Sequence, residues 1–452
     1  LVTKMADGGK VNLAKKMSSF YRITSFLVII LSISNARKLS DIQFNPGCKL
    51  PECSKDVRNT SHINVAYIQA KGPKDTLHYV MSSVGSTSVL VAMTTDIKAT
   101  LNIRWADFLS GNMTRIKNSI NFTSAVEYAY AVSLNRVLEY NDFKDVARMT
   151  EYSAMNESYW RKFPTSAFNW NDSALTSDSD HNTVVFQTRM QDHSNSTKMN
   201  SSSPVFMGNG SLALKFQVFN DSSRNPMLPH LAHTNNSCQL DLVLFNISSA
   251  FKSARYAVEL SLVTTDKAST PMSLKEDTSI DDEYTPGVFK IDDWVVGNGE
   301  HQTYIQWKPV SYLSDPASMK ASTLARNYGL QNMAKTPQAD ILYAYFGDKL
   351  VNGQLAARSA NVSFGLSMDK FYVKQNYTSW SATIGYGPPP ADTLSLLVII
   401  IIAVGIGVPV LLIMGGCIFL CVRKRKDQND YKPLNADYNT ECTVSYCSCV
   451  AG

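Results

Sequence analysis

A single uncharged stretch constrains this 452-residue chain more than any other feature. Residues 394–422 contain no charged side chain, and the basic run Arg423-Lys424-Arg425-Lys426 follows at once. A bilayer core needs roughly 20 apolar helical residues, whereas a soluble core helix of this length would carry polar side chains on one face. We therefore predict a transmembrane helix over residues 393–422 rather than a buried helix of a soluble protein. The basic run predicts that residues 423–452 form a cytosolic tail and that the preceding residues lie outside the cytosol.

The N-terminal segment predicts a precursor that enters the secretory pathway. We expect translation to start at Met17, which is followed by Arg22, an apolar run over residues 26–33, and small residues at Ser34 and Ala36. This is the pattern of a signal peptide cleaved after Ala36, so residues 1–36 are interpreted as leader and signal peptide, with an uncleaved signal anchor as the alternative. Its removal lowers the formal net charge from +5 to about +1. No nucleic-acid partner follows from that charge.

The region between these two landmarks, residues 37–392, is rich in N-x-S/T sequons. Thirteen occur there and none in the tail, which predicts an extracytoplasmic ectodomain with heavily glycosylated surface loops. Because a region of this length exceeds what one core usually serves, we predict two subdomains with a boundary near residues 191–204, a Ser- and Asn-rich run. The sequons are at Asn59, Asn112, Asn121, Asn156, Asn171, Asn195, Asn200, Asn209, Asn220, Asn235, Asn246, Asn361 and Asn376.

Alternation of apolar and polar residues predicts that the ectodomain is built from β-strands. The alternation appears at residues 100–105, 212–218, 240–244, 258–262 and 362–366. A strand with this pattern turns one face to the core and the other to water, as in antiparallel sandwiches. The predicted fold class is therefore an all-β, sandwich-like ectodomain followed by one transmembrane helix. Only residues 124–140 also fit a helical period, and there the two periods are hard to separate.

The ectodomain contains three cysteines, Cys48, Cys53 and Cys238, so at least one stays unpaired within the chain. Cys48 and Cys53 are close enough in sequence for a disulfide across the turn between them. Their spacing alone leaves this pairing open.

Motifs for catalysis or metal binding are missing, so we predict no enzyme activity, no metal and no cofactor. The run 178–189 begins like a calcium loop, but Thr183 and Arg189 replace the glycine and the glutamate that such a loop needs. The densest carboxylate cluster is Asp281-Asp282-Glu283. Paired carboxylates can perform acid–base hydrolysis. Three adjacent residues cannot all face one cleft, however, which favours a solvated turn before a strand at Val288.

The tail contains a sorting signal. Tyr431-Lys-Pro-Leu434 fits the Y-x-x-Φ pattern that clathrin adaptors bind in an extended conformation, with Tyr431 and Leu434 in separate pockets. Its position shortly after a membrane helix predicts delivery to endosomes and lysosomes through an adaptor.

Several short segments spread over the ectodomain are distinctive. They are Thr-Leu-His-Tyr-Val at 76–80, Asn-Gly-Ser-Leu-Ala at 209–213, Ser-Ile-Asp-Asp-Glu-Tyr at 279–284, Gln-Trp at 306–307 and Ser-Trp-Ser at 379–381. Together with the membrane helix behind them, they resemble the glycosylated lysosomal membrane protein family. The chain differs from vertebrate members in having fewer luminal cysteines and a tail that continues well beyond the tyrosine motif.

The resemblance implies a non-enzymatic accessory subunit that binds a lysosomal major-facilitator transporter exporting dipeptides and shields it from luminal proteases. In the membrane helix, Ala403 and Gly407 form a small-xxx-small pair that suits close helix packing, and Pro409 can kink the helix. Glycine is also common in membrane helices that pack against nothing in particular. Two rival functions are a self-standing glycocalyx protein that protects the lysosomal membrane and a luminal hydrolase using the carboxylates near Asp281.

Overall fold

The computed structural model describes residues 36–53, 64–152, 157–168, 170–171, 182–188, 210–281, 284–297, 301–334, 336–390 and 396–429. The chain forms two compact units, Leu1–Asp392 and Thr393–Gly452. The signal peptide up to residue 35 and the subdomain boundary predicted near residues 191–204 lie outside the described residues.

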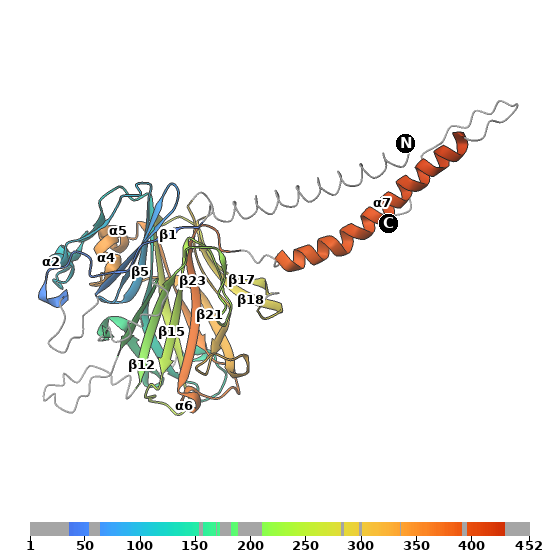
Figure 1. The fold of residues 1–452 in the computed structure, drawn as a ribbon. Coiled ribbons are helices and arrows are strands. Elements are labelled where there is room, and N and C mark those ends of the chain that lie inside the picture. Colours follow the sequence, from blue (N-terminus) through green and yellow to red (C-terminus); the bar gives the residue numbers. More distant parts are fainter. Residues whose placement is uncertain are drawn as a thin grey trace. The chain divides into compact units, whose positions relative to one another are not determined.

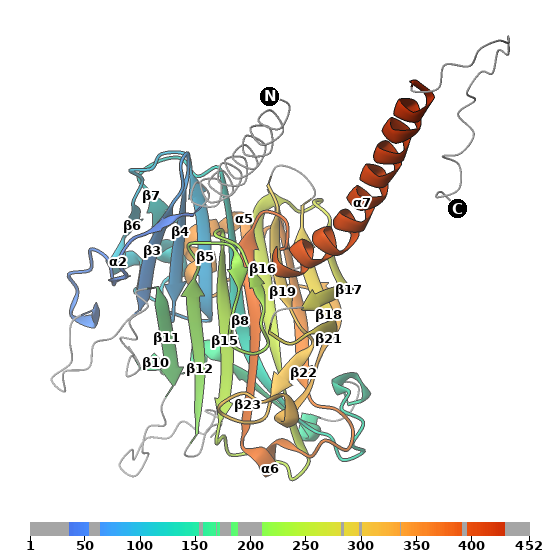
Figure 2. The same cartoon turned by 45° about the vertical axis from the view of Figure 1, so that its right-hand side comes forward.

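The first unit is a sandwich of two antiparallel β-layers, as the sequence predicted (Figures 1 and 2). The first layer has the order β3-β4-β5-β8-β16-β22-β21, with β1 and β2 beside β3 and β9 beside β8. The second has the order β10-β11-β12-β15-β23-β19-β18-β17, with β20 beside β23. Strand β21 also pairs with β20, so it joins the two layers.

The strands of the first layer are β1 Lys38–Leu39, β2 Gln43–Phe44, β3 Val65–Lys71, β4 Thr76–Ser82, β5 Thr87–Thr94, β8 Tyr128–Asn141, β9 Trp160–Pro164, β16 Ala254–Lys267, β21 Ser322–Asn332 and β22 Leu355–Phe364. Those of the second are β10 Trp170–Asn171, β11 Thr183–Thr188, β12 Ser211–Val218, β15 Ser237–Phe245, β17 Met272–Asp281, β18 Gly287–Val296, β19 Thr303–Trp307, β20 Val310–Tyr312 and β23 Tyr377–Tyr386. Two small ribbons pair β6 Leu101–Ile103 with β7 Ile120–Phe122 and β13 Ser223–Arg224 with β14 Ala232–His233.

The main core lies between the two layers and follows the alternation of the sequence. In β12, Leu212, Leu214, Phe216 and Val218 are buried, while the intervening residues are partly exposed. The strands predicted at 240–244 and 258–262 are confirmed as parts of β15 and β16. Burial of each large apolar side chain stabilises the fold by roughly 2 kcal/mol relative to its exposure.

The first layer is covered on both faces. In β3, Ala66 and Ile68 face the main core, while Val65 and Tyr67 belong to a second cluster that packs under the short helices. Strands β3, β4 and β5 are therefore almost continuously buried instead of alternating. The α-helices are α2 Trp105–Phe108, α3 Met113–Ile116, α4 Ile341–Phe346, α5 Asp348–Val351, α6 Tyr372–Gln375 and α7 Leu396–Asn429. Single-turn 3₁₀ helices span Pro51–Cys53, Met149–Glu151, Glu157–Tyr159, Thr165–Ala167 and Met319–Ala321.

The structure decides one alternative that the sequence left open, and it corrects two sequence-based expectations. Residues 124–140, which also fitted a helical period, contribute to the 14-residue strand β8. The strand expected over 100–105 is only Leu101–Ile103, because Trp105 begins α2 and turns its ring into the cluster under the helices. Leu366 lies beyond the end of β22 and is 48% exposed, so it is not an inward-facing strand residue.

Candidate interaction surfaces and an ectodomain cavity

The sequons that the structure describes lie on several sides of the sandwich. Asn112, Asn220, Asn246 and Asn376 are exposed, and Asn121 and Asn235 are half-buried. Asn112 precedes α3, and its Oδ1 accepts hydrogen bonds from the backbone and the hydroxyl of Thr114, which leaves its Nδ2 available for a glycan. Asn171 lies in β10, and the remaining five sequons are outside the described residues: Asn59, Asn156, Asn195, Asn200 and Asn209.

Exposed sequons occur at both ends of the second layer. Asn246 follows β15 and Asn376 precedes β23, and the Asn246 N–H donates to the Asn376 carbonyl at 2.7 Å. Both residues have positive φ, a conformation that asparagine tolerates better than most residues. At the opposite end of these strands, Asn220 follows β12 and Asn235 precedes β15. Glycans on these four residues would therefore cover both ends of the sheet.

Among the sequons whose burial the structure describes, one has its asparagine inside the fold. Asn361, in β22, is only 6% exposed, and its Nδ2 donates to Gln331 Oε1 at 3.4 Å. The hydroxyl residue of that sequon, Ser363, is fully buried and lies 2.7 Å from the Tyr328 hydroxyl. A glycan on Asn361 would have to break the packing of β22, so this sequon does not belong to the exposed set.

Within its described residues, the second unit contains one helix that is long and apolar enough to cross a membrane. Residues Val398–Arg423 within α7 have a mean hydropathy of 2.9. Ala403 and Gly407 are four residues apart and therefore lie on one face of this helix. Pro409 lies inside the helix. The small side chains at Ala403 and Gly407 would allow another helix to approach this face closely.

The structure joins Cys48 and Cys53 in a disulfide. Cys238 is a free, fully buried thiol in β15, and burial raises its pKa to about 12, so it is unreactive as a nucleophile. Tyr431 and Leu434 of the sorting signal lie outside the described residues.

The carboxylate cluster does not form a hydrolytic pair within the described residues. Asp281 is fully buried at the end of β17, where its Oδ2 lies 3.6 Å from Lys308 Nζ and its Oδ1 accepts from the Tyr284 N–H. Asp281 is thus not part of a solvated turn, which corrects that expectation. Asp282 and Glu283 are outside the described residues, and β18 begins at Gly287, so the strand predicted at Val288 is confirmed. The described residues contain no cluster of metal-binding side chains.

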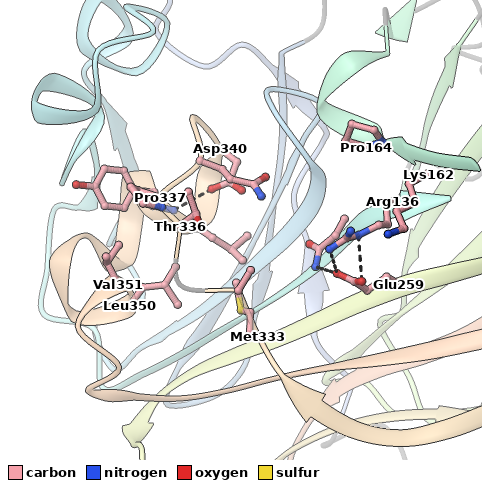
Figure 3. A pocket seen from close by; sticks show the side chains of 15 residues that line it. Arg136, Lys162, Pro164, Glu259, Met333, Thr336, Pro337, Asp340, Leu350 and Val351 are labelled. Carbon is pink, nitrogen blue, oxygen red and sulfur yellow. Dashed lines mark hydrogen bonds and ion pairs between the residues drawn. The ribbon is translucent and has the colours of Figure 1, made fainter. Parts of the chain in front are cut away.

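A cavity of about 250 Å³ lies between the first layer and the α4–α5 segment (Figure 3). Arg136, Lys162 and Glu259 line one side, and apolar side chains of the α4–α5 segment line the other. Asp340, at the N-terminus of α4, is 5% exposed, and its Oδ1 accepts from the Tyr343 N–H at 3.0 Å. Burial raises the pKa of Asp340 to about 7, because the ionised carboxylate is poorly solvated there.

Sequence reasoning missed this cavity. Its residues come from β8, β9, β16 and the segment that follows β21, which are far apart in the chain. No short motif connects them. The pairings of β8 with β16 and with β9 bring the strand residues together, and the segment after β21 lies across from them.

Comparison with known proteins identifies a family that matches most of the chain. The sequence model of the family described as glycosylated lysosomal membrane protein matches residues 64–427. Glycosylated lysosomal membrane protein B of Xenopus laevis is 33% identical over 410 residues, which cover 88% of this chain and 93% of that protein. The glycosylated lysosomal membrane protein of Homo sapiens is 33% identical over 382 residues, which cover 82% of this chain and 87% of that protein. The glycosylated lysosomal membrane protein of Danio rerio is 30% identical over 404 residues, which cover 88% of this chain and 92% of that protein.

Proposed function

Since this chain belongs to the glycosylated lysosomal membrane protein family and is a single-pass protein of the lysosomal membrane, we propose that it is an accessory subunit of a lysosomal major-facilitator transporter for dipeptides. In this role it stabilises the transporter and protects it from luminal proteases. The observation that carries the proposal is the combination of exposed sequons at both ends of a compact sandwich with a single membrane helix.

Steric exclusion is the physical basis of the protection. A protease must bind an extended substrate segment in its cleft, and a bulky hydrated glycan beside that segment prevents the approach. The sandwich itself resists cleavage because its backbone is hydrogen-bonded in long ladders, such as the 14-residue strands β8 and β16. A partner whose luminal loops lie under this ectodomain would share its protection.

The membrane helix supplies the second half of the proposed interaction. Helices in a bilayer associate through close packing of small residues, since apolar surface alone gives no driving force there. The face with Ala403 and Gly407 lets a transporter helix approach the α7 backbone closely. We further propose that Tyr431 and Leu434 bind a clathrin adaptor, which delivers the complex to the lysosome.

The proposal is tested by the lifetime of the transporter in cells that lack this chain. We expect the transporter to be degraded faster, and the wild-type chain to restore its lifetime. A variant with Asn→Asp at the four sequons that are exposed in the described part of the chain should restore it poorly. These sequons are Asn112, Asn220, Asn246 and Asn376.

The matched control replaces four exposed amide residues outside sequons by the corresponding acid, which adds the same charge and leaves the sequons unchanged. These are Gln43, Asn118, Asn332 and Asn352. An unchanged transporter lifetime in cells without this chain would contradict the proposal and favour a self-standing glycocalyx protein. Equal rescue by both variants would remove the glycans from the protective mechanism.

A further inference from the structure

The cavity beside α4 and α5 has the size of a small-ligand site. Its volume is about 250 Å³. An engineered cavity of about 150 Å³ holds benzene, and pockets for drug-sized molecules begin at about 300 Å³. A molecule of roughly ten non-hydrogen atoms fits between these limits.

A β-bulge shapes the polar side of the cavity. Arg136 pairs with Glu259 across β8 and β16, but the next pair is Leu134 with Leu260, so Asn135 is an extra residue without a cross-strand partner. Such bulges redirect side chains and are frequent beside functional sites. Here the bulge brings the Asn135 side chain to Glu259, whose Oε1 accepts from Asn135 Nδ2 at 3.1 Å. The same Asn135 Nδ2 also donates to Ser261 Oγ.

The polar side of the cavity has a net positive charge, because two cations and one carboxylate line it: Arg136, Lys162 and Glu259. Arg136 and Glu259 form a two-point ion pair, with Nε–Oε2 at 3.0 Å and Nη2–Oε1 at 3.2 Å, so they largely neutralise each other. Lys162, on β9, is exposed and has no ion pair among the described residues. Asp340 is buried on the other side, and its raised pKa of about 7 makes it mainly uncharged in an acidic lumen. The unbalanced charge is therefore the ammonium group of Lys162.

The opposite side is mainly apolar, although Thr336 and the buried Asp340 also line it. Figure 3 shows Pro337, Leu350 and Val351 across the cavity from Arg136 and Lys162, with Met333 between the two sides. Leu342 of α4 completes this side. A ligand that packs against the apolar side chains and also pairs with the Lys162 ammonium group has an apolar body and one anionic group.

We propose that this cavity binds a small monocarboxylate with an apolar or aromatic body, whose carboxylate pairs with Lys162 and whose body packs against the α4–α5 segment. The site is independent of the proposed role toward a transporter, because it lies wholly within the ectodomain and uses none of the exposed sequons.

The test is titration of the full-length glycosylated protein, in detergent at pH 5, with 3-phenylpropionate. Isothermal calorimetry should show saturable binding at one site. The cationic isostere 3-phenylpropylamine should give no saturable heat, which separates the charge requirement from adsorption to the micelle. Equal binding of the carboxylate and the amine would overturn the proposal, as would the absence of saturable binding by the carboxylate.

Two variants locate the binding. Lys162→Gln, at an exposed position, should weaken binding about fivefold, the loss expected of one partly solvated charge pair. Lys374→Gln, at an exposed position of α6 outside the cavity, should bind as the wild type does. Val351→Trp fills the cavity and should abolish binding in protein that melts as one cooperative transition. Unchanged affinity in Lys162→Gln, or binding that survives in folded Val351→Trp protein, would contradict the assignment.

Discussion

Arg255 shows how single residues hold this sandwich together. It is only 3% exposed and pairs with Asp142, Asp145 and Asp369 at 2.6–2.7 Å. Asp142 is fully buried and also accepts hydrogen bonds from the backbone N–H groups of Val146 and Ala147. One guanidinium thus ties strand β16 to the segments after β8 and β22. Buried charges of this kind are costly unless every partner is present.

Arg255→Met is expected to destabilise the ectodomain by about 3–5 kcal/mol, because it leaves Asp142 buried without its cation. Arg104→Met is the matched control. Arg104 is half exposed in its pair with Asp107, a type of contact worth about 0–1 kcal/mol. Urea unfolding of the full-length protein, followed by tryptophan fluorescence, measures both effects. Similar midpoints for the two variants would show that the Arg255 cluster is not a main source of stability.

Burial also predicts which sequons carry glycans. We expect glycopeptide mass spectrometry to find glycans on the exposed Asn246 and Asn376 and none on Asn361, which is 6% exposed in β22. A glycan on Asn361 in folded protein would show that β22 adopts a different register or packing from the one described here.

At the scale of elements, alternation predicted β12 and β15 of the second layer and β16 and the end of β22 of the first. It gave no signal for β3, β4 and β5 of the first layer, because both faces of these strands are covered. Strand β8 places Val132 in the main core and Ala129 and Ala131 under the short helices, so its buried positions are nearly continuous and fit two periods. The short helices were not predicted, since each is a single turn or two whose formation depends on contacts distant in sequence.

The site could be predicted only in part. The sequons and the membrane helix are local patterns, so they can be recognised from the sequence alone. The burial of Asn361 and Asp281 and the cavity around Lys162 depend on which strands become neighbours, and no local pattern encodes that pairing. The structure was therefore needed chiefly to show which of these motifs are exposed and which are buried.

The membrane helix offers a test of the packing face. Gly407→Leu should weaken recovery of the transporter severalfold, since the larger side chain separates the two helices. Gly405→Leu is the matched control, because two residues correspond to about 200° of helical rotation and place it on the other side. Comparable co-purification of both variants with the partner would remove the Ala403–Gly407 face from the interface.

The molecule as a whole contains buried carboxyl groups whose raised pKa values make the fold more stable at acidic pH than at neutral pH. Burial raises the pKa of Asp292 from 3.8 to about 6, and it raises the pKa values of Asp340 and Glu139 as well. A carboxyl whose pKa is higher in the folded state stabilises the fold fully below its unfolded pKa and loses that effect as pH rises through the folded value. His78, whose pKa burial lowers to about 4, acts in the opposite direction and weakens the fold in acid.

We expect Asp292→Asn to reduce the pH dependence of stability. In the wild type, Asp292 should contribute about 1 kcal/mol more at pH 5 than at pH 7.5, because its proton is lost between them. The asparagine variant has no such proton, so its unfolding free energy should fall less over this range. Asp277→Asn, an exposed position in β17, should keep the wild-type dependence. Identical pH profiles for the wild type and Asp292→Asn would rule out a contribution from this group.

The accessory-subunit account is tested most directly by affinity capture of the tagged chain from mildly solubilised lysosomal membranes, with stoichiometry measured by mass spectrometry. The account predicts recovery of a polytopic major-facilitator transporter at close to one copy per copy of this chain. Recovery of the chain alone, under detergent conditions that preserve other lysosomal membrane complexes, would contradict it.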